Sequence, residues 1–312
     1  MQTGEAFTDT VFMVRPATFR ANRQTAASNE FQRASSADAA VILDEFDRSV
    51  ERLEAVGVRV HVGQDTPDPP KPDAVFPNNW VSFHADGTLV TYAMAAPNRR
   101  AEVRRELIDE LERDLGFRYP RWLDLRGEAR HGRYLEGTGS LVLDRASRRA
   151  LVARSPRNDS GLVADWAREM GYAVTEVTSV GPSGQPVYHT NVLVALGPDF
   201  VVVASSWLPR ESRRRVDAWI TEAGRISIEL DEAEARSFGA NALALSTSSH
   251  PSLWVLSEGA LAGLRPQTRV RLESRAELLS LPISTIEAVG GGSARCLLAE
   301  VFRPNAEDSK SH

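Results

Sequence analysis

The sequence GGGSARCLLAEVF occupies residues 290–302 and contains the only cysteine of the chain, Cys296. Consecutive glycines permit positive φ angles and let the backbone approach another surface closely. The apolar run of residues 297–302 is typical of a buried strand, so we expect Cys296 where a flexible loop enters rigid structure. A cysteine placed in this way is a candidate nucleophile, although most lone cysteines are inert buried thiols.

Four predicted helices upstream of this stretch share one pattern, which is an apolar face, a terminal glycine and a short strand. The helices cover residues 36–56, 99–115, 160–170 and 210–223, and the strands that follow them cover 58–62, 122–123, 172–174 and 226–228. A weaker fifth helix is predicted from Arg275 to Leu281, before a strand at Ile283. Hairpin-like strand pairs lie between the units, at 80–83 with 89–92, 141–143 with 150–152, and 192–194 with 200–203.

This repetition predicts an α/β fold, a closed propeller of five units with the functional site where the loops meet at its axis. A helix, a glycine, a strand and a hairpin recur about five times at roughly 45–60 residues, as in a radial repeat. An open doubly wound sheet is the alternative, but hairpins are too frequent for an all-parallel sheet. We expect one domain over residues 1–304 and a flexible polar tail over 305–312.

Composition limits the classes of partner and compartment. The chain has 312 residues, 42% of them apolar, and a formal net charge of −5, without a basic stripe that would suggest nucleic acid. A single cysteine excludes an internal disulfide and disfavours a cysteine-based zinc site. No signal pattern and no run of about 18 apolar residues is present. We therefore expect a cytoplasmic protein with no membrane partner, and a homodimer is compatible with these observations.

Four short stretches place unusual polar residues beside a predicted buried strand. They are FPNNW (76–80), LEGTGS (135–140), YHTN (188–191) and the glycine-rich stretch with Cys296. In a radial fold all four could point to one centre. Taken singly, Asn78 and Asn79 could form a turn, Glu136 could be a solvated charge, and His189 could be a structural histidine.

Other features of the sequence point away from a metal and toward a covered site. No histidine pair at helical spacing and no carboxylate cluster accompanies His189, so neither a metal nor a cofactor is expected. His84, beside the Asp86-Gly87 turn, is expected to be exposed and outside the site. The polar segment from Thr18 to Ser36 is long for a plain connector, which favours a loop that covers the substrate.

Six motifs in this order resemble those of the guanidino-group-modifying enzymes, the pentein superfamily of arginine deiminases, dimethylargininases and amidinotransferases. The motifs are FPNNW (76–80), APNRR (96–100), LEGTGS (135–140), SPR (155–157), YHTN (188–191) and GGGSARC (290–296). Within the superfamily the chain looks most like the citrulline-utilisation hydrolases of the CtlX-like branch. The resemblance runs from Val14 to Phe302 and implies a five-bladed ββαβ propeller with an axial active site.

The resemblance also implies roles for individual residues. Cys296 corresponds to the nucleophile, His189 to the general acid/base, and Glu136 to a carboxylate that grips the substrate. The thiolate would be favoured by nearby positive charge on His189 or Arg295, which would lower the pKa of Cys296.

Three arginines are candidates for binding the α-carboxylate of an amino-acid substrate. Arg99 and Arg157 match arginines that do so in dimethylargininases, and a planar guanidinium binds a carboxylate bidentately. Arg15 is a weaker candidate, for which a structural role is equally compatible with the sequence.

The sequence departs from the deiminases at two positions where they carry carboxylates that bind the guanidinium. Asn79 and Asn191 align with those carboxylates, and Asn78, in the same motif as Asn79, is a further candidate contact. Removing a partner from a buried ion pair costs about 3–5 kcal/mol. A ureido group is neutral, and an asparagine amide can donate to its oxygen. The pattern therefore favours citrulline over arginine as the substrate.

The function expected from these residues is hydrolysis of citrulline to ornithine, ammonia and carbon dioxide through an S-linked intermediate, without a cofactor. The alternatives are an arginine deiminase, a dimethylargininase or an amidinotransferase that acts on a guanidino compound. A non-catalytic pentein binding protein is a further alternative, which the joint presence of Cys296, His189 and Glu136 disfavours.

Overall fold

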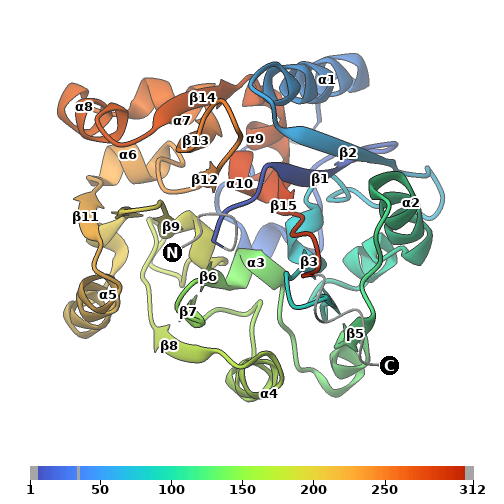
Figure 1. The fold of residues 1–312 in the computed structure, drawn as a ribbon, viewed down its shortest axis with the longest axis horizontal. Helices are drawn as coiled ribbons and strands as arrows, with labels where there is room; N and C mark the ends of the chain where they lie inside the picture. The colour runs from blue at the N-terminus through green and yellow to red at the C-terminus, as the bar shows by residue number, and fades with distance from the viewer. Residues whose placement is uncertain (1–5, 34–35, 306–312) are drawn as a thin grey trace.

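The computed structural model describes residues 6–33 and 36–305, and their strands form five separate three-stranded sheets. The sheets are β15 (Ala299–Glu300) with β1 (Thr10–Arg15) and β2 (Arg59–Gln64); β3 (Val81–Phe83) with β4 (Thr88–Thr91) and β5 (Arg121–Asp124); β6 (Val142–Asp144) with β7 (Arg149–Ala153) and β8 (Ala173–Val177); β9 (Val194–Leu196) with β10 (Phe200–Val203) and β11 (Ile226–Glu229); and β12 (Leu243–Leu245) with β13 (Leu253–Ser257) and β14 (Glu277–Leu281). The sheets are arranged around a central axis (Figure 1).

Every sheet has one antiparallel and one parallel pair of strands, as the predicted ββαβ blade requires. A parallel pair needs a crossover connection, and helices at the rim provide it (Figure 1). These helices are α1 (Ala39–Ala55), α2 (Arg105–Leu115), α4 (Ser160–Met170), α5 (Arg210–Glu222), α7 (Glu258–Gly263) and α8 (Pro266–Glu273). The first blade pairs β1 with β15 from the other end of the chain, which closes the ring.

Most predicted helix ends are confirmed. Asp38 caps α1 by accepting a hydrogen bond from the backbone N–H of Ala40. Gly116 and Gly171 end α2 and α4 in the left-handed conformation, with φ of 71° and 67°. The apolar residue Val41, which was expected on the buried face of α1, is 44% exposed, so the buried face of this helix is rotated away from Val41.

The predicted fifth helix is wrong. Residues Glu277–Leu281 form strand β14, which pairs in parallel with β13, and the crossover helices α7 and α8 precede it. Ile283 is not in a strand but caps α9 (Ser284–Gly290). A segment of five residues is too short for its periodicity to separate a strand from one turn of helix, and only its pairing with β13 shows that it is a strand.

The predicted helix at 99–115 begins later than expected. Residues Pro97–Glu102 form a 3₁₀ turn, η4, and the extended backbone of Val103 separates it from α2. The side chains of Arg99 and Glu102 are buried in the interior, which a continuous surface helix would not allow. His84 is likewise buried, at 3% exposure, rather than exposed as expected.

The surroundings of the cysteine also differ from the prediction. Cys296 lies within a short helix, α10 (Ala294–Leu297), and not in the loop itself. Of the apolar run that follows, only Ala299–Glu300 pair as a strand, β15. The two remaining short helices are α3 (Gly137–Ser140) and α6 (Glu232–Arg236).

The hydrophobic core consists of five clusters of buried residues, in keeping with five blades. Large aromatic side chains such as Trp80, Trp166, Trp219 and Trp254 are fully buried. Within 6–33 and 36–305, no helix has the length and apolarity needed to span a membrane. Apart from Asn305, the predicted C-terminal tail lies outside the described residues.

Candidate active site

Four short helical turns converge at the centre of the ring (Figure 1). Three of them directly precede the first strand of a blade, and the fourth, α10, precedes β15. They are η3 (Pro77–Asn79), α3 (Gly137–Ser140), η6 (Thr190–Val192) and α10. Turn α3 contacts both η3 and η6, and α10 contacts η3. The four polar stretches singled out in the sequence therefore lie together, although more than 200 residues separate η3 from α10.

The convergence forms a cavity of about 280 Å³, including the part open to solvent. Its lining comprises Thr25, Asn29, Asp73, Phe76, Asn79, Arg99, Arg157, Tyr188, His189, Gly290, Gly291, Gly292 and Cys296. A recess of this size, with a few polar groups that point into it, suits a small molecule rather than a macromolecule. Cys296 and His189 share it.

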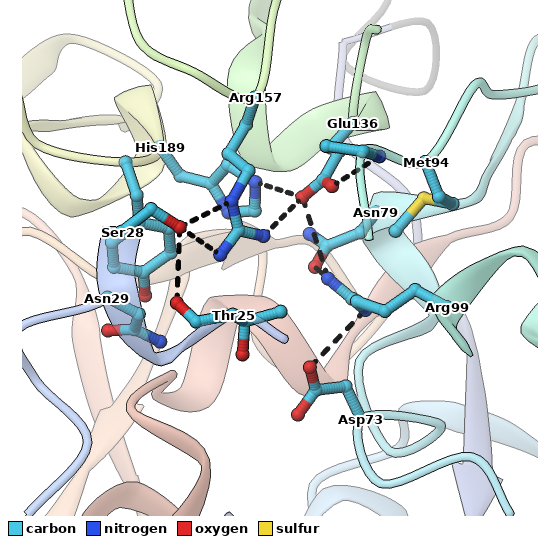
Figure 2. Close-up of polar contacts among 12 residues, drawn as sticks. Thr25, Ser28, Asn29, Asp73, Asn79, Met94, Arg99, Glu136, Arg157 and His189 are labelled. Carbon is cyan, nitrogen blue, oxygen red and sulfur yellow. Dashed lines mark hydrogen bonds and ion pairs between the residues drawn. The ribbon is translucent and has the colours of Figure 1, made fainter. Parts of the chain in front are cut away.

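Glu136 is fully buried and joins the polar groups around the cavity (Figure 2). Its Oε2 accepts hydrogen bonds from Nη1 of Arg157 at 2.9 Å and from Nε2 of His189 at 2.8 Å, and Nη1 of Arg99 lies 3.6 Å away. Its Oε1 accepts from the backbone N–H of Ala95 at 3.1 Å. Burial alone would raise the pKa of Glu136, but Arg157 and the bond from His189 outweigh it and lower that pKa. Glu136 is therefore ionised.

His189 has its second ring nitrogen free. Because an ionised carboxylate only accepts, Nε2 of His189 carries the proton toward Glu136. Nδ1 then has a free lone pair, and no hydrogen-bond partner for it exists among the described residues. Burial lowers the pKa of His189 to about 4, against the opposing effect of Glu136. The imidazole is therefore neutral at pH 7 and able to accept a proton at Nδ1.

Cys296 is 2% exposed, and two side-chain amides approach its sulfur. Nδ2 of Asn191 lies 3.6 Å from Sγ, and Nδ2 of Asn241 lies 3.5 Å from it. The Asn241 amide is oriented by a second bond, which it donates to the backbone carbonyl of Asn191 at 3.0 Å. These donors favour a thiolate, whereas Oδ1 of Asn241, 3.6 Å from Sγ, accepts from the thiol and favours the protonated form.

The expected lowering of the Cys296 pKa is nevertheless wrong, since burial raises it and the amide and backbone donors only partly compensate. The two groups expected to supply positive charge do not supply enough. His189 is neutral, and the guanidinium of Arg295 donates to the carbonyl of Leu298 and to Glu300 instead.

The two arginines predicted to bind a carboxylate both line the cavity. Nε and Nη2 of Arg99 donate to Glu102 at 3.0 and 2.9 Å, and its Nη1 donates to Oδ1 of Asn79 at 2.9 Å. Nε and Nη2 of Arg157 both donate to the hydroxyl of Ser28, at 3.1 and 2.9 Å. A guanidinium has five N–H groups, so each arginine retains donors for a ligand.

The remaining sequence candidates are placed differently. Nδ2 of Asn79 donates to Oδ1 of Asn78 at 2.9 Å, and Asn78 is buried behind the cavity without lining it. Arg15 is outside the site, where its Nε and Nη2 pair with Asp47 at 2.8 Å. Arg15 therefore has the structural role that the sequence left open, and it is not positioned to bind the substrate.

Two site residues were missed in the sequence. Asp73 lines the cavity; its Oδ2 accepts from Asn22 at 2.8 Å, and its Oδ1 has no partner among the described residues. Asn241 was missed although it lies two residues before β12, the first strand of the fifth blade, much as Asn191 lies three residues before β9 in the fourth. The repeat of turn and strand would have found Asn241, whereas the position of Asp73, three residues before Phe76, carries no comparable signal.

The polar segment predicted to cover the substrate contributes Thr25 and Asn29 to the cavity lining, and Figure 2 shows both residues beside Ser28. Nδ2 of Asn29 donates to the carbonyls of Gly290 and Gly291 at 3.2 and 3.3 Å. The hydroxyl of Tyr188 donates to the same Gly291 carbonyl at 2.6 Å. These bonds fix the glycine-rich loop before Cys296. In the part of the chain that the structure describes, no three His, Cys, Asp or Glu side chains are placed to bind a metal.

Comparison with known proteins identifies relatives of this arrangement. The family model described as N,N dimethylarginine dimethylhydrolase, eukaryotic, matches residues 15–303. No curated protein matches the sequence. Among solved structures, the N-terminal domain of ArgZ, an arginine dihydrolase from Cyanobacteria bound to substrate, has a TM-score of 0.74 at 15% identity over 95% of this chain and 98% of that chain.

Two further structures share the fold. A complex of AgrE with L-arginine has a TM-score of 0.73 at 17% identity over 95% of this chain, which spans only 40% of AgrE. A dimethylarginine dimethylaminohydrolase variant with an S-methyl-L-thiocitrulline adduct has a TM-score of 0.64 at 16% identity, over 94% of this chain and 99% of that one. These likenesses confirm the five-bladed pentein fold.

Proposed function

The chain belongs to the N,N-dimethylarginine dimethylhydrolase family of cysteine-dependent C–N hydrolases, and we propose that it hydrolyses the ureido group of citrulline. The products are ornithine, ammonia and carbon dioxide, with one water consumed for each citrulline. The proposal concerns the substrate and the roles of the site residues within this family.

The observation that carries the proposal is the separation of charged and neutral groups in the cavity. Asp73, with its free Oδ1, matches the α-ammonium of an amino acid, and Arg99 and Arg157 match its α-carboxylate. The sulfur of Cys296, in contrast, is approached by the neutral amide of Asn191. A zwitterionic amino acid with a neutral head group fits this distribution of charge.

With Asp73 assigned to the α-ammonium, no further unpaired carboxylate is left to accompany a cationic head group. Glu136 is paired with Arg157. Glu102 is paired with Arg99, and burial raises the pKa of Glu102 to about 8, so Glu102 is largely protonated at pH 7. A guanidinium brought beside Cys296 would lose its hydration without gaining an unpaired negative partner, which is costly. A ureido group avoids this cost and can accept a hydrogen bond from an asparagine amide.

The geometry supports a two-stage mechanism. Binding of the substrate brings the Cys296 proton to Nδ1 of His189, and the sulfur attacks the ureido carbon. The oxygen that becomes negative accepts from amide N–H groups, and Glu136 stabilises the imidazolium. His189 then protonates the leaving nitrogen and afterwards activates a water that hydrolyses the S-linked intermediate. Loss of carbon dioxide from the resulting carbamate completes the reaction.

A second candidate is hydrolysis of a guanidino compound, arginine or a methylated arginine. It is favoured by the fold shared with an arginine dihydrolase and with AgrE bound to L-arginine, and by the family description. In this case the free Oδ1 of Asp73 would interact with the head group rather than with the α-ammonium.

Product analysis separates the two candidates. The protein is incubated separately with citrulline, arginine and dimethylarginine, and ornithine, citrulline and ammonia are assayed. We expect ornithine and ammonia from citrulline, and no product with Cys296→Ala, which should fold normally. Consumption of arginine or dimethylarginine without any turnover of citrulline would contradict the proposal and support the second candidate.

A further inference from the structure

A second polar cavity lies at the opposite end of the blade strands from the active site. The active-site turns precede β3 and β6, whereas this cavity is formed where those strands end, at the β3–β4 and β6–β7 hairpin turns. It has a volume of about 590 Å³, including the part open to solvent. Its lining includes His84, Asp86, Arg145, Arg148, Tyr172 and Phe302.

Arg145 is the buried charge of this cavity, with only 7% of its side chain exposed. Its guanidinium stacks on the ring of Phe302 at 4.2 Å, and its Nη1 lies 3.2 Å from Nδ1 of His84. Its Nε and Nη2 have no hydrogen-bond partner among the residues that the structure describes. The nearest carboxylate oxygen, Oε2 of Glu300, lies 3.5 Å from Nη2, which is an ion-pair contact without a hydrogen bond.

The edge of the guanidinium formed by Nε and Nη2 is the one that binds oxyanions bidentately. Two other arginines show this edge occupied by a carboxylate: Arg15 presents it to Asp47, and Arg126 presents it to Asp124. At Arg145 the same edge is buried and makes no hydrogen bond among the described residues, and only Nη2 has the long contact with Glu300. Buried polar groups are normally hydrogen-bonded, so an empty edge of this kind indicates a ligand.

His84 fixes the orientation of Arg145 without adding charge. An arginine has no acceptor, so Nδ1 of His84 must accept from Nη1. The histidine proton is therefore on Nε2, where it is donated to the hydroxyl of Ser82 at 2.8 Å. Because His84 is neutral and buried, it orients the guanidinium and cannot neutralise a ligand.

The charges around the cavity leave one positive charge uncompensated. Three arginines face two carboxylates: Arg148 donates to Asp86 at 3.3 Å, and Arg295 donates to Glu300 at 2.8 Å. Arg145 has only the long contact with Glu300, which Arg295 already occupies. Binding of one small anion would balance the cluster.

We propose that this cavity is a second binding site, which takes a small oxyanion, either a carboxylate or a phosphate. The Nε–Nη2 edge of Arg145 binds two of its oxygens, and Arg148, whose side chain is 49% exposed, provides the second positive charge at the mouth. Asp86 and Glu300 limit the site to ligands of low charge. The site is separate from the cavity that contains Cys296.

Titration calorimetry on the full chain tests the proposal, with sodium acetate and inorganic phosphate as separate probes at constant ionic strength. Loss of a charge-assisted bidentate contact of about 1.5–3 kcal/mol predicts that Arg145→Gln weakens the preferred probe at least about tenfold. Arg126→Gln, which alters an exposed arginine with an occupied edge, should bind within about twofold of the wild type. Whichever probe binds more tightly identifies the ligand class.

Unchanged affinity in Arg145→Gln, or an equal loss of affinity in Arg126→Gln, would overturn the proposal. If Arg145→Gln does not fold, crystals of the wild-type chain soaked in selenate replace the variant. An anomalous peak within hydrogen-bonding distance of Nε of Arg145 is expected. Peaks confined to Arg99 and Arg157, or none at all, would refute the site. Neither readout depends on the substrate of the active site.

Discussion

At the scale of single residues, Cys296 and His189 line the same cavity, and both side chains are neutral in the free protein at pH 7. Burial raises the pKa of the thiol and lowers the pKa of the imidazole to about 4. A thiolate–imidazolium pair is therefore not preformed at neutral pH, and the proposed mechanism requires the proton to move to Nδ1 of His189 during attack. Two amides, from Asn191 and Asn241, are in place to stabilise the sulfur once it is charged.

The first prediction concerns pH and uses the single cysteine as its own reporter. Only the thiolate reacts with iodoacetamide, and its fraction grows about tenfold per pH unit below the thiol pKa. Because the pKa of Cys296 is raised, the alkylation rate should still increase throughout pH 7–9. A rate that is constant over this range would indicate a preformed thiolate and contradict the assignment.

The second prediction concerns Asn241, which we regard as a positioning residue for the thiolate. Asn241→Ala should lower kcat about tenfold or more, by analogy with loss of one donor to a developing anion, with KM little changed. It should also move the alkylation profile of Cys296 to higher pH.

Asn158→Ala is the matched control, because it loses a similar side-chain bond, from Nδ2 to the carbonyl of Ala153 at 2.9 Å, without contact to the sulfur. A merely structural role for Asn241 would lower stability in both variants alike and leave the alkylation profile in place.

The sequence predicted which residues lie together at the centre, but it did not predict their environment. Cys296, His189 and Glu136 stood out by type and by resemblance, and all three meet at the centre. The direction of the Cys296 pKa shift was wrong, because a motif does not show how deeply its residues are buried. Asp73 was missed because only the folding of the chain brings it to the cavity, and no sequence motif marks it.

At the scale of elements, the site depends on close contact between turns that glycines make possible. A Cβ on Gly139 would lie 2.6 Å from Nδ2 of Asn79 and 2.7 Å from Nδ1 of His189. Real Cβ atoms do not approach other atoms so closely, and both side chains are buried and cannot easily move. Turn α3 can therefore lie against η3 and His189 only without a side chain at position 139.

The third prediction follows from this contact. Gly139→Ala should displace Asn79 or His189 and lower kcat/KM by about 10²-fold, as a misplacement of about 1 Å can, while unfolding shifts by about 1–3 kcal/mol. Gly127→Ala is the control, because a Cβ there meets nothing within 4 Å and its φ is not positive. Equal activity of the two variants would show that the close contact is unimportant.

Element boundaries were predictable where local chemistry sets them. Asp38, Gly116 and Gly171 are caps that work by local hydrogen bonding or φ, and each was found from the sequence. Strand β14 was mistaken for a helix because its identity depends on pairing with β13, which the local sequence does not show. The start of α2 was placed too early because Arg99 lies in the separate turn η4, where its side chain is buried in the interior. The local sequence does not show this burial either.

At the scale of the whole molecule, the buried carboxylate of Glu136 connects blades. It belongs to the turn before β6, and it binds Arg157 after β7, His189 before β9 and the backbone of Ala95 after β4. Its ionisation offsets the charge of buried arginines. The ring is therefore joined at its axis by one acid, in addition to its hydrophobic core.

The fourth prediction is that Glu136→Gln destabilises the fold by about 3–5 kcal/mol, as expected when a buried ion pair loses one partner. The measurement is the urea midpoint of unfolding. Glu258→Gln, which breaks the half-exposed pair with Arg52 at 2.8 Å, should cost only about 0–1 kcal/mol. Similar midpoints for the two variants would mean that Glu136 has no special role in connecting the blades.

The circular arrangement could be predicted from the recurrence of similar units, because a repeat that cannot bury its own surface must stack against the next one. The recurrence could not predict the pairing of β1 with β15, which joins the two ends of the chain. It also could not predict the depth of the axial cavity. A homodimer and a cytoplasmic location remain predictions.

The most direct test of the central claim is to trap the intermediate. The protein is mixed with citrulline carrying carbon-13 in its ureido group, quenched in acid within one turnover, and mapped by peptide mass spectrometry. We predict that the labelled carbon is attached to the peptide that contains Cys296 and that Cys296→Ala neither retains the label nor forms ornithine. Ornithine formation with no label on Cys296, or turnover by the Cys296→Ala variant, would contradict the account.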